Sequence, residues 1–181
     1  MRSGLLFSIL LTGLVAPVSA GPSPNLENSR HRFEITEMHG RKAPALALTD
    51  WQNSKPLSLA DLKGKIVVLD FWATHCSECL ASVPKLNALA AKYEDRGVVF
   101  VGVCLADGGE RMPAMVKRHK MAYPTAVDTN GLTAKAFMAD SYPDYYVIDR
   151  AGNLRWGDIQ NSHVEKAIGI LLSETDTGAG G

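Results

Sequence analysis

Hydrophobic positions along this chain follow two different periods. Residues 66–71 and 98–103 are almost wholly apolar and rich in β-branched side chains, which is typical of strands buried on both faces of a parallel sheet. Between these runs, apolar residues recur every three or four positions from residue 80 to residue 93, the spacing of a helix that packs one face on a sheet. The pattern predicts a strand, a helix and a second parallel strand joined by a right-handed crossover.

Shorter patterns predict the remaining elements. Strands are expected at residues 32–36, 45–48, 56–59 and 123–127. Helices are expected at 110–120 and 130–137, a hairpin at 145–156, and a last helix at 162–172 capped by Ser162. Pro84 is expected to bend the long helix, because its ring removes one intrahelical hydrogen bond. Strands that alternate with helices indicate the α/β class, with a central mixed sheet flanked by helices.

The chain divides into four parts. Residues 1–20 have the features of a signal peptide: a positive start at Arg2, an apolar stretch, and small residues before the expected cleavage after Ala20. A retained membrane anchor is the alternative, but the apolar stretch is shorter than the roughly 20 residues that span a bilayer. We therefore expect a periplasmic or secreted protein, in a compartment where disulfides persist. After the signal we expect an extended lead-in at 21–42, one domain at 43–173 and a flexible tail at 174–181.

Composition is consistent with this division. With 181 residues, of which 46% are hydrophobic, the chain can bury one good core. Its 19 basic residues balance 19 acidic residues, so the formal net charge is zero. This balance gives no electrostatic preference for nucleic acid, and we expect no nucleic-acid partner.

Cys76 and Cys79 stand where the first long strand gives way to the long helix. A helix N-terminus carries unpaired N–H groups and about half a positive charge, so it stabilises a thiolate relative to a thiol. Two intervening positions bring Cys79 within disulfide reach but deeper against the core. We therefore expect Cys76 to be the nucleophile and Cys79 the resolving thiol. The third cysteine, Cys104, ends an apolar run and is expected to be buried and away from the pair.

Three separated motifs carry a family resemblance. Residues 65–79 read KIVVLDFWATHCSEC, Val83-Pro84 follows, and residues 142–152 read YPDYYVIDRAG. From about residue 43 to 172 the chain resembles the thioredoxin-like thiol-disulfide oxidoreductases, in the exported branch that includes TlpA, ResA and the cytochrome c maturation reductases. The resemblance implies a thioredoxin-like fold with an N-terminal β extension and a βα element inserted at about 105–130.

The resemblance also assigns roles to supporting residues. Pro143 corresponds to a cis-proline that faces the dithiol, so that backbone groups of Tyr142 become available to a substrate chain. Asp70 lies six residues before Cys76, where thioredoxins have a buried aspartate that helps to take the proton of the second cysteine. No resident metal and no cofactor are implied.

Three positions depart from the family pattern. His75 stands where tryptophan is usual, Ser77-Glu78 replaces the common pair between the cysteines, and Tyr142 precedes the proline. The Glu78 carboxylate disfavours a thiolate at Cys76, whereas a protonated His75 would favour one. Because Glu78 is charged at neutral pH and His75 mostly is not, we expect a less acidic thiol and a more reducing pair.

The leading functional hypothesis is an exported oxidoreductase that reduces protein disulfides through a mixed disulfide. The family suggests apocytochrome c thiols or copper-site cysteines as substrates, and an integral membrane reductase as electron donor. One alternative is a copper-binding or copper-delivery protein that uses the dithiol, with His75 as a further ligand. A thiol peroxidase of the peroxiredoxin type and a redox-inert adaptor are the others.

Overall fold

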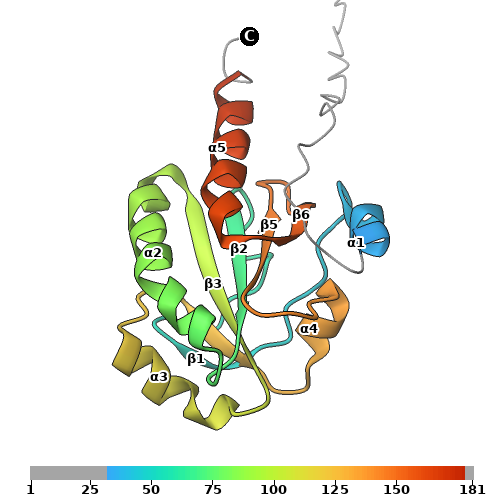
Figure 1. The fold of residues 1–181 in the computed structure, drawn as a ribbon. Helices are drawn as coiled ribbons and strands as arrows, with labels where there is room; N and C mark the ends of the chain where they lie inside the picture. The colour runs from blue at the N-terminus through green and yellow to red at the C-terminus, as the bar shows by residue number, and fades with distance from the viewer. Residues whose placement is uncertain (1–31, 178–181) are drawn as a thin grey trace, which may run out of the picture.

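The computed structural model describes residues 32–177 and contains one mixed six-stranded sheet (Figure 1). The strand order is β1-β4-β3-β2-β5-β6. Strands β2, β3 and β4 are parallel to one another, whereas β1, β5 and β6 each pair antiparallel with their neighbours. The strands are β1 (Thr49–Gln52), β2 (Ile66–Trp72), β3 (Val98–Leu105), β4 (Thr125–Asp128), β5 (Asp144–Ile148) and β6 (Leu154–Ile159).

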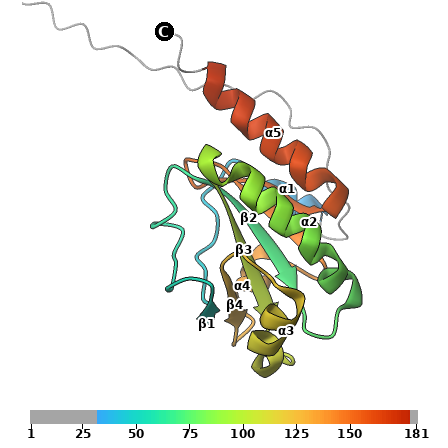
Figure 2. The ribbon, with the colours of Figure 1, turned by 90° about the vertical axis from the view of Figure 1, so that its left-hand side faces the viewer.

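Helices cover both faces of this sheet, which confirms the α/β prediction (Figure 2). Helices α2, α3 and α5 contribute to the core on one face, and α4 to the core on the other, where α1 also packs. On the first face, Lys92 of α2 and Glu165 of α5 form an ion pair of 2.7 Å between neighbouring helices. The helices are α1 (Arg32–Met38), α2 (Ser77–Tyr93), α3 (Met112–His119), α4 (Leu132–Phe137) and α5 (Asn161–Thr177), with short 3-10 turns at Glu94–Arg96 and Gly109–Arg111.

The central strand β2 separates two hydrophobic cores. Every residue of β2 is buried because its neighbours pair on both sides and helices cover both faces. Val68 and Trp72 point into the core under α2, whereas Leu69 and Phe71 point into the opposite core with Phe137 of α4. This burial on both sides explains why the sequence of β2 is almost continuously apolar.

Three of the expected short strands, at 32–36, 45–48 and 56–59, are wrong. Residues 32–36, expected as a strand in an extended lead-in, form most of helix α1. Ile35 of α1 is fully buried and lies against Gly157 and Tyr146, so packing on the sheet decides this segment. The expected strands at 45–48 and 56–59 are absent from the described sheet, and β1 instead forms in the polar stretch between them. Its residues pair with β4, which supplies backbone partners regardless of side-chain pattern.

The expected tail begins too early. Helix α5 continues to Thr177, so residues 174–177 are helical rather than part of a flexible tail. The Arg155 guanidinium on β6 donates two hydrogen bonds of 2.7 Å to the Glu174 carboxylate, which holds this last part of α5 against the sheet. Pro84 lies inside α2, whose helical assignment continues past it, so the expected bend stays a prediction.

The signal-peptide prediction falls on residues 1–20, outside the described residues, as do residues 178–181 of the expected tail. Within residues 32–177, no helix combines the length and hydrophobicity needed to cross a bilayer.

Candidate active site

The two cysteines of the redox motif lie at the N-terminus of α2. Strand β2 ends at Trp72, and a turn closed by a hydrogen bond of 3.1 Å from Cys76 N to Ala73 O leads into the helix. Cys76 is the N-cap residue, and its Sγ accepts a hydrogen bond of 3.1 Å from the backbone N–H of Cys79. Cys76 and Cys79 form a disulfide with a Cα–Cα distance of 5.3 Å. The predicted position of the pair at a strand-to-helix junction is therefore correct.

The two sulfurs differ in exposure. Cys76 is half-buried at the rim of the core, whereas the Cys79 side chain is 3% exposed and packs with Val83 and Leu86 inside it. A protein disulfide can therefore reach Cys76 but not Cys79. The backbone N–H that points at Cys76 Sγ also stabilises negative charge on that sulfur when the disulfide is open.

The peptide bond between Tyr142 and Pro143 is cis, as the resemblance implied. Asp144, the next residue, pairs with Phe71 near the end of β2, so Pro143 lies at the same end of the sheet as the dithiol turn. Tyr142 is half-buried, packs against both cores, and donates a hydrogen bond of 3.4 Å to Ala139 O.

Asp70 is a buried carboxyl group on the dithiol side of the sheet. Val68, Asp70 and Trp72 are every second residue of β2, so their side chains point to the same face of the sheet. On that face Val68 and Trp72 pack in the same core as Cys79. The residue is 2% exposed, and its Oδ2 accepts a hydrogen bond of 2.7 Å from the Tyr123 hydroxyl. Burial raises the pKa of Asp70 from 3.8 to about 7, and the hydrogen bond from Tyr123 opposes this rise. Asp70 is therefore the kind of group that can exchange a proton near neutral pH.

The other two predicted supporting residues are exposed. Both His75 and Glu78 lie on the surface beside Cys76. Their influence on the sulfur therefore acts through solvent, which weakens it relative to a buried charge.

Thr74 is a site residue that the sequence reasoning missed. Its buried hydroxyl donates a hydrogen bond of 3.1 Å to Gly108 O, which ties the loop after β3 to the turn before Cys76. Gly108 has a positive φ of 73°, and a Cβ on it would lie 2.6 Å from Thr74 Oγ1. The adjacent pair Gly108-Gly109 was the available sequence signal for this close approach.

Cys104 is buried, as predicted, but it is not remote from the redox motif. It pairs in register with Trp72 and packs in the same core as Cys79. Burial raises the pKa of the Cys104 thiol to about 12, and the negative charges of Glu110 and Asp70 add to the rise. The thiol therefore stays protonated and is a poor nucleophile at neutral pH.

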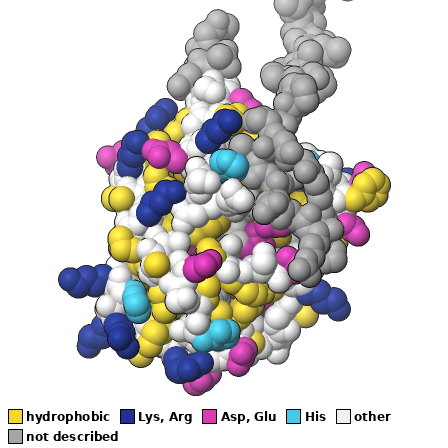
Figure 3. Space-filling model, in the orientation of Figure 1, with side chains coloured by type: hydrophobic (Ala, Val, Ile, Leu, Met, Phe, Trp, Pro, Cys, Tyr) yellow, Lys and Arg dark blue, Asp and Glu magenta, His cyan; other side chains and the backbone are white. Residues whose placement is uncertain are grey.

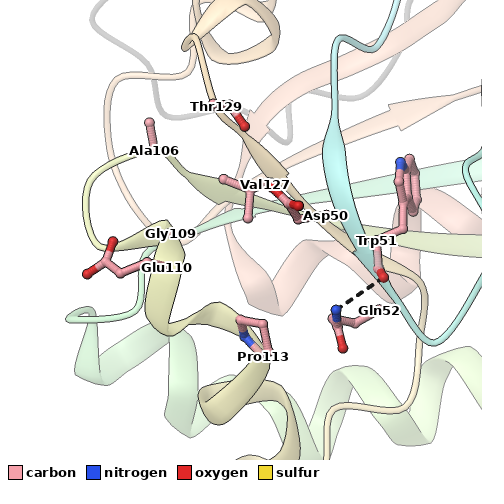
Figure 4. Close-up of a pocket in the computed structure, with 9 residues that line it drawn as sticks. All are labelled: Asp50, Trp51, Gln52, Ala106, Gly109, Glu110, Pro113, Val127 and Thr129. Atoms are coloured by element: carbon pink, nitrogen blue, oxygen red, sulfur yellow. Dashed lines mark hydrogen bonds between the residues drawn. The ribbon is translucent and has the colours of Figure 1, made fainter.

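A surface hollow of about 640 Å³ lies between β1, β4 and the turn before α3 (Figure 4). In Figure 4, Glu110 and Pro113 line one side, and the β1 residues Asp50, Trp51 and Gln52 line the other. None of the predicted site residues lines this hollow. Gly109 lines the hollow, and the adjacent Gly108 accepts the hydrogen bond from Thr74 in the turn before Cys76.

Basic and acidic side chains are scattered over the face of the molecule seen in Figure 3, with hydrophobic side chains among them. In the part of the chain that the structure describes, no three His, Cys, Asp or Glu side chains are grouped so that they could hold a metal ion.

The mixed sheet, the dithiol at a helix N-terminus and the cis-proline at the same end of the sheet define a thioredoxin-like redox protein. The AhpC/TSA family model matches residues 39–157, more than half of the chain. The chain belongs to this family.

Named relatives agree with this assignment. The thiol-disulfide oxidoreductase ResA of Bacillus thuringiensis subsp. konkukian is 31% identical over 115 residues, which span 64% of this chain and 66% of that protein. The thioredoxin-like protein YneN of Bacillus subtilis is 32% identical over 142 residues, 77% of this chain and 79% of YneN. A putative thiol:disulfide interchange protein DsbE from Chlorobium tepidum has a similar structure, with a TM-score of 0.66 and 30% identity over 74% of this chain and 97% of that one. With its Cys76-x-x-Cys79 motif, the chain is an enzyme of the thiol-disulfide oxidoreductase class.

Proposed function

We propose that this enzyme reduces disulfides of other proteins outside the cytoplasm. The observation that carries the proposal is the asymmetry of the dithiol, with Cys76 accessible at the N-terminus of α2 and Cys79 buried within disulfide distance of it. This arrangement suits a reaction in which one sulfur meets the substrate and the other completes the exchange.

The reaction begins with the reduced enzyme. The Cys76 thiolate attacks one sulfur of the substrate disulfide, a Cys76–substrate S–S bond forms, and the other substrate sulfur leaves as a thiolate. Cys79 then loses its proton and attacks Cys76 Sγ. The Cys76–Cys79 disulfide forms, the second substrate sulfur leaves, and two electrons have passed from the enzyme to the substrate.

Asp70 and the Tyr142–Pro143 turn support these steps in the proposal. Asp70 accepts the proton of Cys79, because it lies on the face of β2 whose residues Val68 and Trp72 pack in one core with Cys79, and its pKa of about 7 allows exchange near neutral pH. The cis-proline turn leaves backbone groups at the dithiol end of the sheet, where an extended substrate segment can pair with them.

Glu78, one of the two residues between the cysteines, favours a reducing direction of electron flow. Glu78 disfavours the Cys76 thiolate, and a less stable thiolate makes the dithiol a better reductant. Regeneration of the dithiol then needs an electron donor, which we propose is an integral membrane reductase.

The cellular setting follows from the predicted signal peptide at residues 1–20 and from the similarity to ResA and DsbE. We place the enzyme in the periplasm or among secreted proteins. Its substrates in this proposal are protein disulfides such as those of apocytochrome c or of copper-site cysteines, which must be reduced before haem or copper is attached.

A redox titration tests the direction. The purified enzyme is equilibrated with glutathione mixtures, and the Cys76/Cys79 redox state is read by thiol alkylation. A potential near that of thioredoxin, about −270 mV, supports a reductase, whereas one near about −120 mV means a disulfide donor and contradicts the proposal.

Reduction of insulin disulfides then measures turnover. Cys76→Ser is expected to abolish it, Cys79→Ser to accumulate a mixed disulfide, and Cys104→Ser to leave it unchanged as the matched control. Peroxide consumption far above that of a free thiol, or Cu(I) binding by the reduced enzyme that survives glutathione competition, would instead favour the peroxidase or the copper protein.

A further inference from the structure

The buried carboxyl group of Asp70 is held by a residue from a different part of the chain. Tyr123 lies in the loop between α3 and β4, within the inserted segment, and its hydroxyl donates the 2.7 Å hydrogen bond to Asp70 Oδ2. Both residues are buried, Asp70 at 2% and Tyr123 at 3% exposure. The second oxygen, Asp70 Oδ1, is also buried and has no hydrogen-bond partner among the described residues. The two oxygens of this carboxyl group therefore differ, because Oδ2 accepts a hydrogen bond and Oδ1 accepts none from the described residues.

We propose that Tyr123 is a positioning residue for the closing step of the thiol-disulfide exchange. Its hydroxyl fixes the Asp70 carboxylate through Oδ2 and leaves Oδ1 as the atom that takes the proton of Cys79. The inference rests on the proposed function, in which Cys79 must lose a proton before it attacks the mixed disulfide.

The closing step transfers one proton and exchanges one S–S bond for another. Cys79 Sγ–H gives its proton to Asp70 Oδ1, so that a thiolate and a neutral carboxylic acid form. The thiolate attacks Cys76 Sγ, the Cys76–Cys79 bond forms, and the bond between Cys76 and the substrate breaks. The substrate sulfur leaves with the electron pair of that bond, and Asp70 later returns its proton to water.

Among the titratable groups that surround Asp70, only Asp70 itself changes charge near neutral pH. Tyr123 faces it from the α3–β4 loop, Cys104 from β3 and Tyr145 from β5, while Cys79 lies in the same core from α2. Burial raises the pKa of both tyrosines and raises that of Cys104 to about 12, so these three groups stay neutral at physiological pH. A hydrogen bond from a hydroxyl to a carboxylate favours the ionised form, which is the form that can accept a proton.

A Tyr123→Phe substitution removes only the donor. The ring packs near Phe100, with centroids 6.1 Å apart, and phenylalanine keeps that contact. Without the hydrogen bond the pKa of Asp70 rises, and we expect the pH midpoint of the closing step to rise by about one unit or more. At pH values below the wild-type midpoint, closure should slow about tenfold, whereas attack by Cys76 should keep its rate.

The experiment uses stopped-flow mixing of the reduced enzyme with an aromatic disulfide whose released thiolate is coloured. The first phase reports attack by Cys76 and depends on reagent concentration. The second phase reports closure by Cys79 and does not. Tyr145→Phe is the matched control, because it removes a buried hydroxyl that accepts a hydrogen bond of 3.2 Å from Asn161 Nδ2 instead of binding Asp70.

The expected result is a shifted second phase in Tyr123→Phe, an unshifted one in Tyr145→Phe, and no further effect of Tyr123→Phe in an Asp70→Asn background. Equal midpoints in wild type and Tyr123→Phe, or a shift that persists with Asp70→Asn, would overturn the inference alone. A wild-type enzyme with no second phase would overturn the proposed function and the inference together.

A measurement on the wild-type enzyme tests the inference even if the Tyr123→Phe variant does not fold. The carboxyl carbon of Asp70 can be titrated by NMR in the reduced state. The inference requires that this titration and the midpoint of the second phase coincide. A separation of more than about one pH unit would refute it.

Discussion

The burial of Asp70 predicts that the Asp70→Asn enzyme is more stable than wild type, and increasingly so as pH rises. The amide side chain of this variant keeps an oxygen that can accept the Tyr123 hydrogen bond, but it carries no charge to desolvate. The native pKa of about 7 lies above the unfolded value of 3.8, so the native state binds the proton more tightly. Between these two pH values the folded wild-type protein holds more protons than the unfolded chain, and its stability falls as pH rises.

The size of the effect follows from the two pKa values of Asp70. A difference of about three units corresponds to about 4 kcal/mol at pH values above 7, when the carboxyl group must be ionised in both states. Below about pH 4 the group is protonated in both states and the effect vanishes. Asp144, whose pKa is raised to about 9 by burial and by Asp158, titrates in both proteins, and its contribution cancels in the comparison.

Urea denaturation of wild type and Asp70→Asn at about pH 4, 6 and 8, with the disulfide intact, measures this difference. We expect little difference at the lowest pH and a gain of about 2 to 4 kcal/mol at the highest, since the wild-type native state relaxes around the charge. A gain that is the same at all three pH values would refute the reasoning, because a packing change has no such pH dependence. A stability loss at pH 8 would refute the assigned burial cost.

Three further predictions concern the surroundings of the dithiol. Glu78→Gln should lower the pKa of the Cys76 thiol by a few tenths of a unit, measured by thiolate absorbance against pH; a higher pKa would contradict the assigned role of Glu78. Gly108→Ala should destabilise the protein by about 1–3 kcal/mol more than Gly131→Ala, measured by urea denaturation. Both glycines have a positive φ, but only a Cβ at residue 108 would meet Thr74 Oγ1. Equal losses in the two variants would mean that the close approach carries no cost. Thr74→Val should lower the free energy of unfolding by about 1 kcal/mol in the same assay, because it removes the hydroxyl that donates to Gly108 O. The loop at Gly108 should then be cleaved faster by proteases, and unchanged proteolysis would contradict the link between Thr74 and this loop.

Long, regular patterns were the most reliable part of the sequence. The apolar run that became β2, the helical stripe of α2 and the apolar run of β3 were all identified in order, because each covers several turns or a full strand. The Cys76-x-x-Cys79 motif and the cis bond before Pro143 were predicted from local sequence and its resemblance to a known family.

Short elements were predicted poorly. Residues 32–36 alternate like a strand, yet they form a helix because one side chain, Ile35, packs into the space left by Gly157. Strand β1 has a polar sequence and forms because β4 offers it a backbone edge. In both cases the deciding partner is distant in the chain, so no local pattern could reveal it.

The redox chemistry of this protein is local, because a strand end, two cysteines and a helix start follow one another directly in the chain. The surroundings of the dithiol depend on the three-dimensional fold, which brings Tyr123 to Asp70, Gly108 to Thr74, and Cys104 into the same core as Cys79. Buried polar atoms take their partners from whichever segment packs against them, and packing across the sheet sets those partners independently of neighbours in the chain.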